Sequence, residues 1–245
     1  MSARLHELFG RTYIINLPFR IDRRRQMVHQ LRRVGIPLAK GKVEFFEAVR
    51  PETAGGFETI GARGCFLSHL GILEQALRDG LESVLVMEDD LSFAAAYPEM
   101  EKAALDVLCH HSWGLVYFGC GGFEAASSEF GMQAVPPTQP LKYTHFYGVH
   151  HDLLVPLVSF LHQLLTRPPG SPEGGPMHVD GAYQTFRERN HDFTTLVAYP
   201  SLGFQRRSRQ DIHALRWFDR TPLISRAAEC FRSVTNWCEE RLGRY

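Results

Sequence analysis

The chain has 245 residues and a mass of 27.9 kDa, enough for one large domain with a substantial core. Basic and acidic side chains number 27 each, which argues against binding that depends on overall charge, and we expect no nucleic-acid partner. A hydrophobic content of 44% excludes a disordered chain. No apolar run approaches the roughly 18 residues that a membrane-spanning helix needs.

The cysteines and the amino terminus indicate a cytoplasmic protein. The five cysteines show neither the paired spacing of a zinc motif nor a disulfide framework, which predicts reduced thiols. Residues 1–10 lack the apolar run of a secretory signal.

Charge is unevenly distributed along the chain. Residues 1–33 carry a net charge of +6 and residues 201–245 a net charge of +4, whereas residues 34–200 hold ten basic and twenty acidic side chains. The two basic ends can converge in space. Arginine outnumbers lysine by 23 to 4, and guanidinium groups suit phosphate binding, although genomic base composition is an equal explanation of the ratio.

Strands and helices alternate through the first half of the chain. The predicted elements are a strand over 11–17, a helix over 23–34 with Asp22 as its N-cap, a strand over 42–49, a glycine-rich loop over 50–64, a helix over 65–78, a strand over 83–87, a helix over 98–111 and a strand over 114–118 that glycines end. This alternation predicts an α/β fold with a mostly parallel sheet covered by helices.

The second half is less regular. Segments 119–142 and 166–178 are rich in Gly, Pro and Ser and predict loops over a site. The other predicted elements are a helix over 153–165, a helix over 179–189, a strand over 194–199 and an amphipathic helix over 222–242. We therefore expect a single domain over residues 1–220 and a C-terminal helix, residues 221–245, packed on the domain or on a membrane surface.

Three carboxylates, Glu88, Asp89 and Asp90, follow the strand over 83–87 directly. Ligands of open α/β sheets bind beyond the carboxyl ends of the strands, and oxygen-rich ligand sets prefer Mg²⁺ or Mn²⁺. If the backbone stays extended, Glu88 and Asp90 share one side while Asp89 anchors the loop from the other. A solvated acidic turn is the alternative explanation.

Three motifs together resemble glycosyltransferase family 25, which includes bacterial lipooligosaccharide galactosyltransferases and collagen galactosyltransferases. They are Tyr13-Ile14-Ile15-Asn16-Leu17 with Arg20, Asp22 and Arg23; Gly64-Cys65-Phe66-Leu67-Ser68-His69; and Val84-Leu85-Val86-Met87-Glu88-Asp89-Asp90. The resemblance is strong over residues 11–93 and thinner afterwards.

The resemblance implies a GT-A fold, a Rossmann-like sheet that holds Mn²⁺ (or Mg²⁺) and a UDP-sugar donor, and inversion at the anomeric carbon. It makes Asp90 the best direct metal ligand, with Glu88 next and His213 completing the set. Asn16, Arg20 and Arg23 match the first motif, and with Glu88 and Asp89 they are the expected donor-binding residues. The alternative for Asn16, Arg20 and Arg23 is a structural role at a strand end and a solvated helix start.

Asp180 matches a later family aspartate and is the predicted catalytic base, since an inverting transferase must deprotonate the acceptor hydroxyl. A helix N-cap is the alternative role for it. A basic loop of Arg206, Arg207 and Arg209 is expected to close over the diphosphate.

One departure from the family is a missing carboxylate. The family has Gly-Glu-Ile-Gly where this chain has Gly61-Ala62-Arg63-Gly64, which leaves the identity of the sugar open.

The predicted function is transfer of a hexose, galactose or glucose, from a UDP-sugar to a hydroxyl of a glycan such as lipopolysaccharide or lipooligosaccharide. The expected partners are this donor and a glycan or lipid-linked glycan acceptor, with peripheral contact at the inner membrane face as an option. Two alternatives remain: a catalytically degenerate GT-A domain that binds a glycan or a protein, and a metal-dependent phosphohydrolase that uses the same carboxylates.

Overall fold

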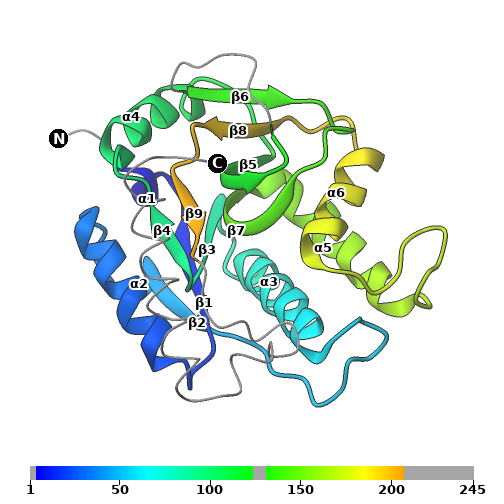
Figure 1. Ribbon diagram of the computed structural model, residues 1–245. Coiled ribbons are helices and arrows are strands. Elements are labelled where there is room, and N and C mark those ends of the chain that lie inside the picture. The colour runs from blue at the N-terminus through cyan, green and yellow to red at the C-terminus, as the bar shows by residue number, and fades with distance from the viewer. Residues whose placement is uncertain (1–3, 124–130, 207–245) are drawn as a thin grey trace.

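A seven-stranded mixed sheet forms the centre of the protein in a computed structural model, which describes residues 4–123 and 131–206 (Figure 1). Its strand order is β2-β1-β3-β7-β5-β8-β6. The strands are β1 (Arg11–Asn16), β2 (Val43–Glu47), β3 (Ser83–Glu88), β5 (Leu115–Gly121), β6 (Gly131–Val135), β7 (Lys142–His150) and β8 (Thr195–Tyr199). Five of these strands run in one direction, and β7 and β6 run in the other.

Helices cover both faces of this sheet (Figure 1). On one face lie α1 (Leu5–Leu8), α2 (Ile21–Arg33) and α4 (Tyr97–Leu108), beside a small antiparallel sheet of β4 (Leu91–Phe93) and β9 (Gly203–Gln205). On the other lie α3 (Ile60–Arg78), α5 (His151–Thr166) and α6 (Val179–Arg189). The predicted α/β class with mostly parallel strands, expected of a single-domain GT-A type fold, is confirmed.

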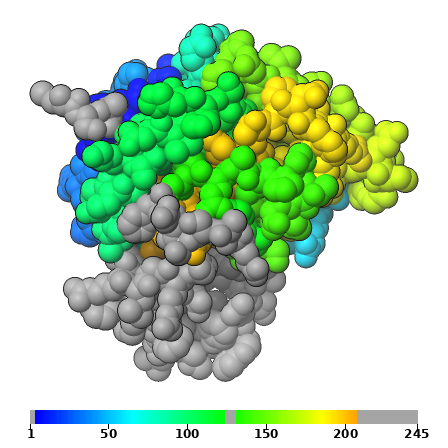
Figure 2. Space-filling view, turned by 90° about the horizontal axis from the view of Figure 1, so that it is seen from above, coloured from blue at the N-terminus to red at the C-terminus, as the bar shows by residue number. Residues whose placement is uncertain are grey.

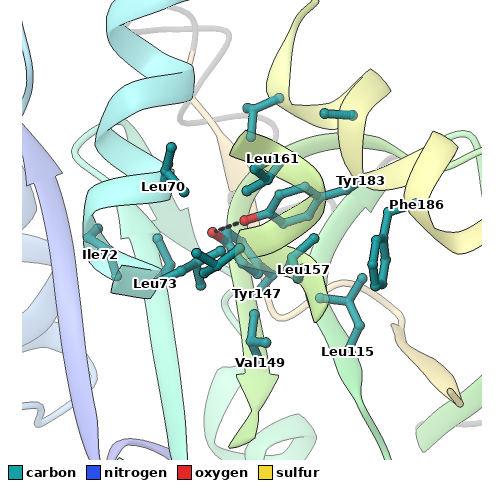
Figure 3. Close-up of a cluster of buried hydrophobic side chains, with 14 of the residues drawn as sticks. Leu70, Ile72, Leu73, Leu115, Tyr147, Val149, Leu157, Leu161, Tyr183 and Phe186 are labelled. Atoms are coloured by element: carbon teal, nitrogen blue, oxygen red, sulfur yellow. Dashed lines mark hydrogen bonds between the residues drawn. The ribbon is translucent and has the colours of Figure 1, made fainter. Parts of the chain in front are cut away.

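Strand alternation divides the core into two clusters. On β3, Val84 and Val86 pack with α3, α5 and α6, whereas Leu85 and Met87 pack with α1, α2 and α4. Figure 3 shows the first cluster, in which leucines of α3 and α5 surround Tyr147 of β7. The hydroxyl of Tyr147 lies 2.8 Å from that of Tyr183 on α6, so both buried hydroxyls have a partner.

Four strands were not predicted, namely β6 and β7 of the central sheet and the two short strands β4 and β9, and one strand was predicted too short. β7 lies at the centre of the sheet, but its histidines and Gly148 interrupt the apolar alternation by which a strand is recognised. β6 forms within the segment expected to be a loop, at the edge of the sheet. β5 continues through Gly119, where a Cβ atom would lie 2.5 Å from the Gly203 carbonyl oxygen, so glycine permits the close approach.

Two helix starts also differ from the prediction. The N-cap of α2 is Arg20, and Asp22 lies in the first turn, where its carboxylate pairs with the Arg20 guanidinium at 2.9 Å. α3 begins at Ile60, within the predicted loop, because the Thr59 hydroxyl accepts a hydrogen bond from the Ala62 amide at 3.0 Å. The short helix α1 was not predicted, whereas the remaining predicted elements within the described residues agree within a few residues and α6 agrees at both ends.

Figure 2 shows the end of the molecule that carries the β6 edge, where residues of α4 and of the β5–β7 region (green) adjoin those of α6 and β8 (yellow to gold). Within residues 4–123 and 131–206, no helix has the length and apolar character needed to cross a bilayer. The C-terminal helix predicted over 222–242 lies outside the described residues.

Replacement of Leu161 by alanine tests the first core cluster. The side chain is fully buried between α5, α3 and the sheet, so Leu161→Ala should lower the free energy of unfolding by about 2–5 kcal/mol. Val155 lies on the same helix with 60% of its surface exposed, and Val155→Ala should change stability by less than about 0.5 kcal/mol. Urea unfolding of both variants measures the difference, and equal effects would contradict this packing.

Candidate functional site

The carboxyl ends of β1 and β3 lie side by side and carry the first polar residues of the site. Asn16 ends β1 and Glu88 ends β3, with Ile15 and Glu88 in register. The Asp89 amide donates to the Ile15 carbonyl oxygen at 3.1 Å, after which the chain turns at Asp89–Asp90 and enters β4. This edge is where open α/β sheets bind ligands.

Strand alternation sends Glu88 and Asp89 to opposite faces of the sheet. Glu88 continues the row of Val84 and Val86 toward α3, and Asp89 continues the row of Met87 toward α2. The backbone turns before Asp90, so the condition of an extended segment fails and Asp90 lies with Asp89 near α2.

Asp89 is held by two donors. The Asn16 side-chain amide donates to Asp89 Oδ2 at 2.7 Å, and the Arg23 guanidinium donates to Asp89 Oδ1 at 3.0 Å. All three side chains are almost completely buried. Burial raises the pKa of Asp89, and the charge of Arg23 and the bond from Asn16 oppose that rise. Asp89 therefore anchors the acidic turn, as the sequence suggested for it.

Asp90 is less well compensated. Its Oδ2 lies 3.5 Å from Arg23 Nη1 and accepts from the Gln205 amide at 3.3 Å, whereas its buried Oδ1 makes no hydrogen bond with any described residue. Burial raises the pKa of Asp90 to about 7, against the charge of Arg23 and with the help of Glu88 and Asp89. A cation would satisfy the unpaired oxygen.

Glu88 faces nitrogen groups instead. Its Oε1 lies 3.5 Å from Nε2 of His69 on α3, and 16% of its side chain is exposed. Burial raises the pKa of Glu88, but His69, His145 and Arg23 outweigh it and the net pKa is lowered. Glu88 is therefore the more readily ionised of these carboxyl groups.

One arginine from each basic end of the chain lies at the acidic turn. Arg23 comes from residues 1–33, and Arg206 comes from the C-terminal basic segment. Arg206 Nη2 donates to the Asp89 carbonyl oxygen at 2.7 Å and Nη1 donates to the Leu91 carbonyl oxygen, so this arginine braces the turn. Arg20 pairs with Asp22 at the start of α2.

Beside Asn16, a groove of about 430 Å³ opens between α2, β2 and the loop that precedes β2. Arg24 lies over the ring of Phe45 in this groove, 3.9 Å from its centroid. The groove therefore places an aromatic ring and a guanidinium group beside the edge of the acidic turn.

Asp180 lies in the first turn of α6. The N-cap of this helix is His178, so the alternative N-cap role for Asp180 is wrong. Its carboxylate accepts from the Tyr143 amide at 3.3 Å and from the Gly181 amide at 2.8 Å. Burial strongly raises the pKa of Cys65, and the negative charges of Glu88, Asp180 and Asp90 raise it further. His213, Arg207 and Arg209 lie outside the described residues.

Sequence reasoning missed a buried polar row behind Glu88. His69 Nδ1 lies 2.8 Å from the Tyr147 hydroxyl, and that hydroxyl reaches Tyr183. His145 lies two residues before Tyr147 on β7. It is buried, and its Nδ1 has no partner among the described residues. The family motif contains His69, but β7 was not recognised as a strand, so no signal pointed to His145 or Tyr147.

The departure from the family motif has a structural explanation. Ala62 is buried, and Arg63 Nη1 donates to both the carbonyl and the hydroxyl oxygen of Thr53 at 3.0 Å. Ala62 thus stands where the family has its carboxylate, and Arg63, the next residue, fastens the glycine-rich loop onto α3.

Over somewhat less than half of its length, the chain is related in sequence to the glycosyltransferase 25 family, as its motifs predicted, although no protein-family model matches it. A glycosyltransferase 25 family member of Anopheles gambiae is 34% identical over 127 residues, 44% of this chain and 21% of that protein. The inactive glycosyltransferase 25 family member 3 of Homo sapiens is 30% identical over 45% of this chain and 22% of its own length. Procollagen galactosyltransferase 1 of Danio rerio is 31% identical over 45% and 21%. The chain thus spans about a fifth of the length of these relatives.

Solved structures give only distant overlaps. A protein called A197 from STIV aligns with a TM-score of 0.38 and 9% identity, over 84% of this chain and 97% of the other. A glycosyltransferase involved in glycosylation of the major capsid of PBCV-1 aligns with a TM-score of 0.36 and 15% identity, over 78% and 94%. Overlaps at this level carry no argument about the site.

Burial of Asp90 predicts a pH-dependent stability in buffer with EDTA. Its carboxyl group has a pKa of 3.8 in the unfolded chain and about 7 when folded, so the folded state keeps a proton that the unfolded state has lost. Stability should therefore fall as pH rises through this window, and Asp90→Asn should remove that loss.

Urea unfolding at about pH 5 and about pH 8 measures this effect. The variant should gain stability relative to the wild type at the higher pH, whereas the exposed control Asp106→Asn should show no such change. A difference between wild type and Asp90→Asn that does not vary with pH would contradict the buried position of Asp90.

Proposed function

We propose that this protein is an inverting, metal-dependent glycosyltransferase that moves a hexose, galactose or glucose, from a UDP-sugar to a glycan hydroxyl. The observation that carries the proposal is the buried, unpaired Oδ1 of Asp90 at the carboxyl ends of β1 and β3. The sequence relation to glycosyltransferase 25 family members, which include a procollagen galactosyltransferase, supports this class of reaction.

Asp90 and Glu88 are the proposed ligands for Mn²⁺ or Mg²⁺, and we propose His213 as a third. Carboxylate oxygens suit these hard cations, and the pKa of Asp90 is raised by burial and by the charges of Glu88 and Asp89, both of which a bound cation would offset. A bound divalent ion supplies Lewis-acid stabilisation of a nucleoside diphosphate leaving group.

Asn16, Arg20 and Arg23, with Glu88 and Asp89, are the proposed donor-binding residues. Arg20 caps α2, so its amino-terminal amides offer an anion site beside Arg23. The groove next to Asn16 has an aromatic ring and room for the nucleoside. Asn16 and Arg23 each bind one carboxylate oxygen of Asp89, so Asp89 is held in place at the proposed donor site.

Asp180 is the proposed catalytic base for the acceptor hydroxyl. Its carboxylate keeps acceptor capacity beyond its two backbone bonds, and its charge acts on the same thiol as those of Glu88 and Asp90. Inversion needs this base on the side of the sugar opposite the leaving diphosphate.

A glycan such as lipopolysaccharide or lipooligosaccharide is the proposed acceptor, free or lipid-linked. We place the transferase domain in residues 1–220 and give residues 221–245 the role of a helix that rests on the domain or on the inner membrane face. We also propose a cytoplasmic location for the protein.

The second candidate is a degenerate domain that binds a glycan or a protein without turnover. It is favoured by the relative named as inactive and by Ala62, which stands where the family has a glutamate and so leaves the motif without its carboxylate. Consumption of a UDP-sugar by the purified protein excludes it. A phosphohydrolase would instead release sugar phosphate, whereas a transferase releases nucleoside diphosphate.

Calorimetric titration of UDP, CDP, GDP and UDP-sugars in the presence of Mn²⁺ tests the donor site. We expect UDP and a UDP-sugar to bind, and EDTA to abolish the binding. Asp90→Ala should remove metal-dependent binding while the protein stays folded, because its oxygens are the proposed ligands. The exposed control Asp106→Asn should bind as the wild type does. Metal-dependent UDP binding that survives in Asp90→Ala would refute the assignment.

Replacement of Asp180 by asparagine tests the base. General-base catalysis contributes about 10²–10⁴-fold, so Asp180→Asn should lower the turnover number by that factor and leave UDP affinity unchanged. The exposed Asp192→Asn is the matched control, and initial rates of UDP release are the measurement. Full turnover in Asp180→Asn would assign the base to another residue.

A further inference from the structure

One cluster at the site has a chemistry that a manganese site does not require. The thiol sulfur of Cys65, an imidazole nitrogen of His69 and a carboxylate oxygen of Glu88 all lie within 4.8 Å of one another. Cys65 and His69 are four residues apart on α3 and so share one face of the helix, and Glu88 meets them from the end of β3. Sulfur, nitrogen and oxygen ligands together are typical of Zn²⁺.

The imidazole of His69 is oriented as a metal ligand should be. Its Nδ1 lies 2.8 Å from the Tyr147 hydroxyl, which in turn lies 2.8 Å from the Tyr183 hydroxyl. Both hydrogen bonds form when His69 Nδ1 donates to the Tyr147 hydroxyl and that hydroxyl donates to the Tyr183 oxygen. Nε2 then presents its lone pair toward Glu88, and such a second hydrogen bond behind the ring is a regular feature of histidine ligands.

The distances between the ligand atoms of this cluster are close to those around a bound zinc ion. With bonds of about 2.0–2.3 Å, ligand atoms around tetrahedral zinc lie roughly 3.5 Å apart. His69 Nε2 and Glu88 Oε1 already lie 3.5 Å apart, and the Cys65 sulfur lies within 4.8 Å of the Glu88 carboxylate and of an imidazole nitrogen. Cys65 and Glu88 are both partly exposed, so an ion has access and water can fill a fourth position.

We propose that α3 and β3 form a binding site for one zinc-class cation, with the Cys65 thiolate, His69 Nε2 and the Glu88 carboxylate as ligands. Binding releases the thiol proton of Cys65 to solvent and forms the metal–sulfur bond. The site goes beyond the proposed donor site but shares Glu88 with it, so a zinc ion here leaves Asp90 as the remaining carboxylate ligand for manganese.

Cobalt is the probe, because Co²⁺ replaces zinc and a thiolate ligand gives it a sulfur-to-cobalt charge-transfer absorption. We expect the reduced full-length protein to bind one Co²⁺ with this absorption and Zn²⁺ to displace it. Cys65→Ser should abolish the absorption, and the control Cys109→Ser, an exposed cysteine outside the cluster, should keep it. Absence of the absorption in the wild type, or its persistence in Cys65→Ser, would overturn the proposal.

A second variant guards against simple misfolding. Tyr147→Phe keeps the ring in the core but removes the hydrogen bond to His69, so Co²⁺ affinity should fall roughly 10–100-fold. Unchanged affinity would overturn the oriented-imidazole argument. Circular dichroism of each variant confirms the fold.

The outcome is separable from that of the donor site. Asp90→Ala should retain the sulfur absorption while it loses UDP binding. A wild-type protein that binds UDP with Mn²⁺ but shows no sulfur absorption would overturn only the zinc site. One that shows the absorption but does not bind UDP would overturn only the proposed function.

Discussion

The guanidinium of Arg23 lies between two carboxylates that are almost completely removed from water, and the acidic turn keeps its shape because of this contact. Arg23 approaches Asp89 at 3.0 Å and Asp90 at 3.5 Å. Adjacent buried carboxylates repel each other and lose hydration, a cost that a single well-placed cation reduces. Arg23 is held by α2, which packs on the sheet through Met27 and Leu31. The geometry of the site thus depends on how a helix docks, more than on the turn itself.

Arg23 and its neighbours compensate the buried carboxylates only in part, and the carboxylate oxygen left without a donor indicates a ligand. Arg23 and Asn16 satisfy Asp89, but Asp90 keeps an oxygen without a donor among the described residues and a raised pKa. In a purely structural ion pair we would expect every buried carboxylate oxygen to have a hydrogen-bond donor, because a buried polar network with an unpaired oxygen is costly in free energy. The imbalance is what a site would show if a cation completed it.

Strand β7 adds histidine and tyrosine side chains to the site. By running antiparallel between β3 and β5, it brings His145 and Tyr147 beside the end of β3. Glu88 points to this side, toward His69, whereas Asp89 and Asp90 point to the arginine side. One acidic segment therefore faces a guanidinium group near α2 and an imidazole and a thiol near α3. Glu88, which lies on the α3 side, is shared by the proposed donor site and the proposed cation site with Cys65.

Local sequence determined the elements whose residues follow one period without interruption. The apolar run of β3, the strand β1 and the helix α6 were all predictable, and so was the position of the three carboxylates at a strand end, because each depends on neighbours in the chain. Tertiary structure alone decided the contacts between distant residues, such as His69 with Tyr147, 78 positions apart, and Arg23 with Asp89, 66 positions apart. Pairing of β7 in the centre of the sheet makes the first contact and docking of α2 makes the second. Neither depends on local propensity, so the sequence indicated the chemistry of the site but not which side chains share it.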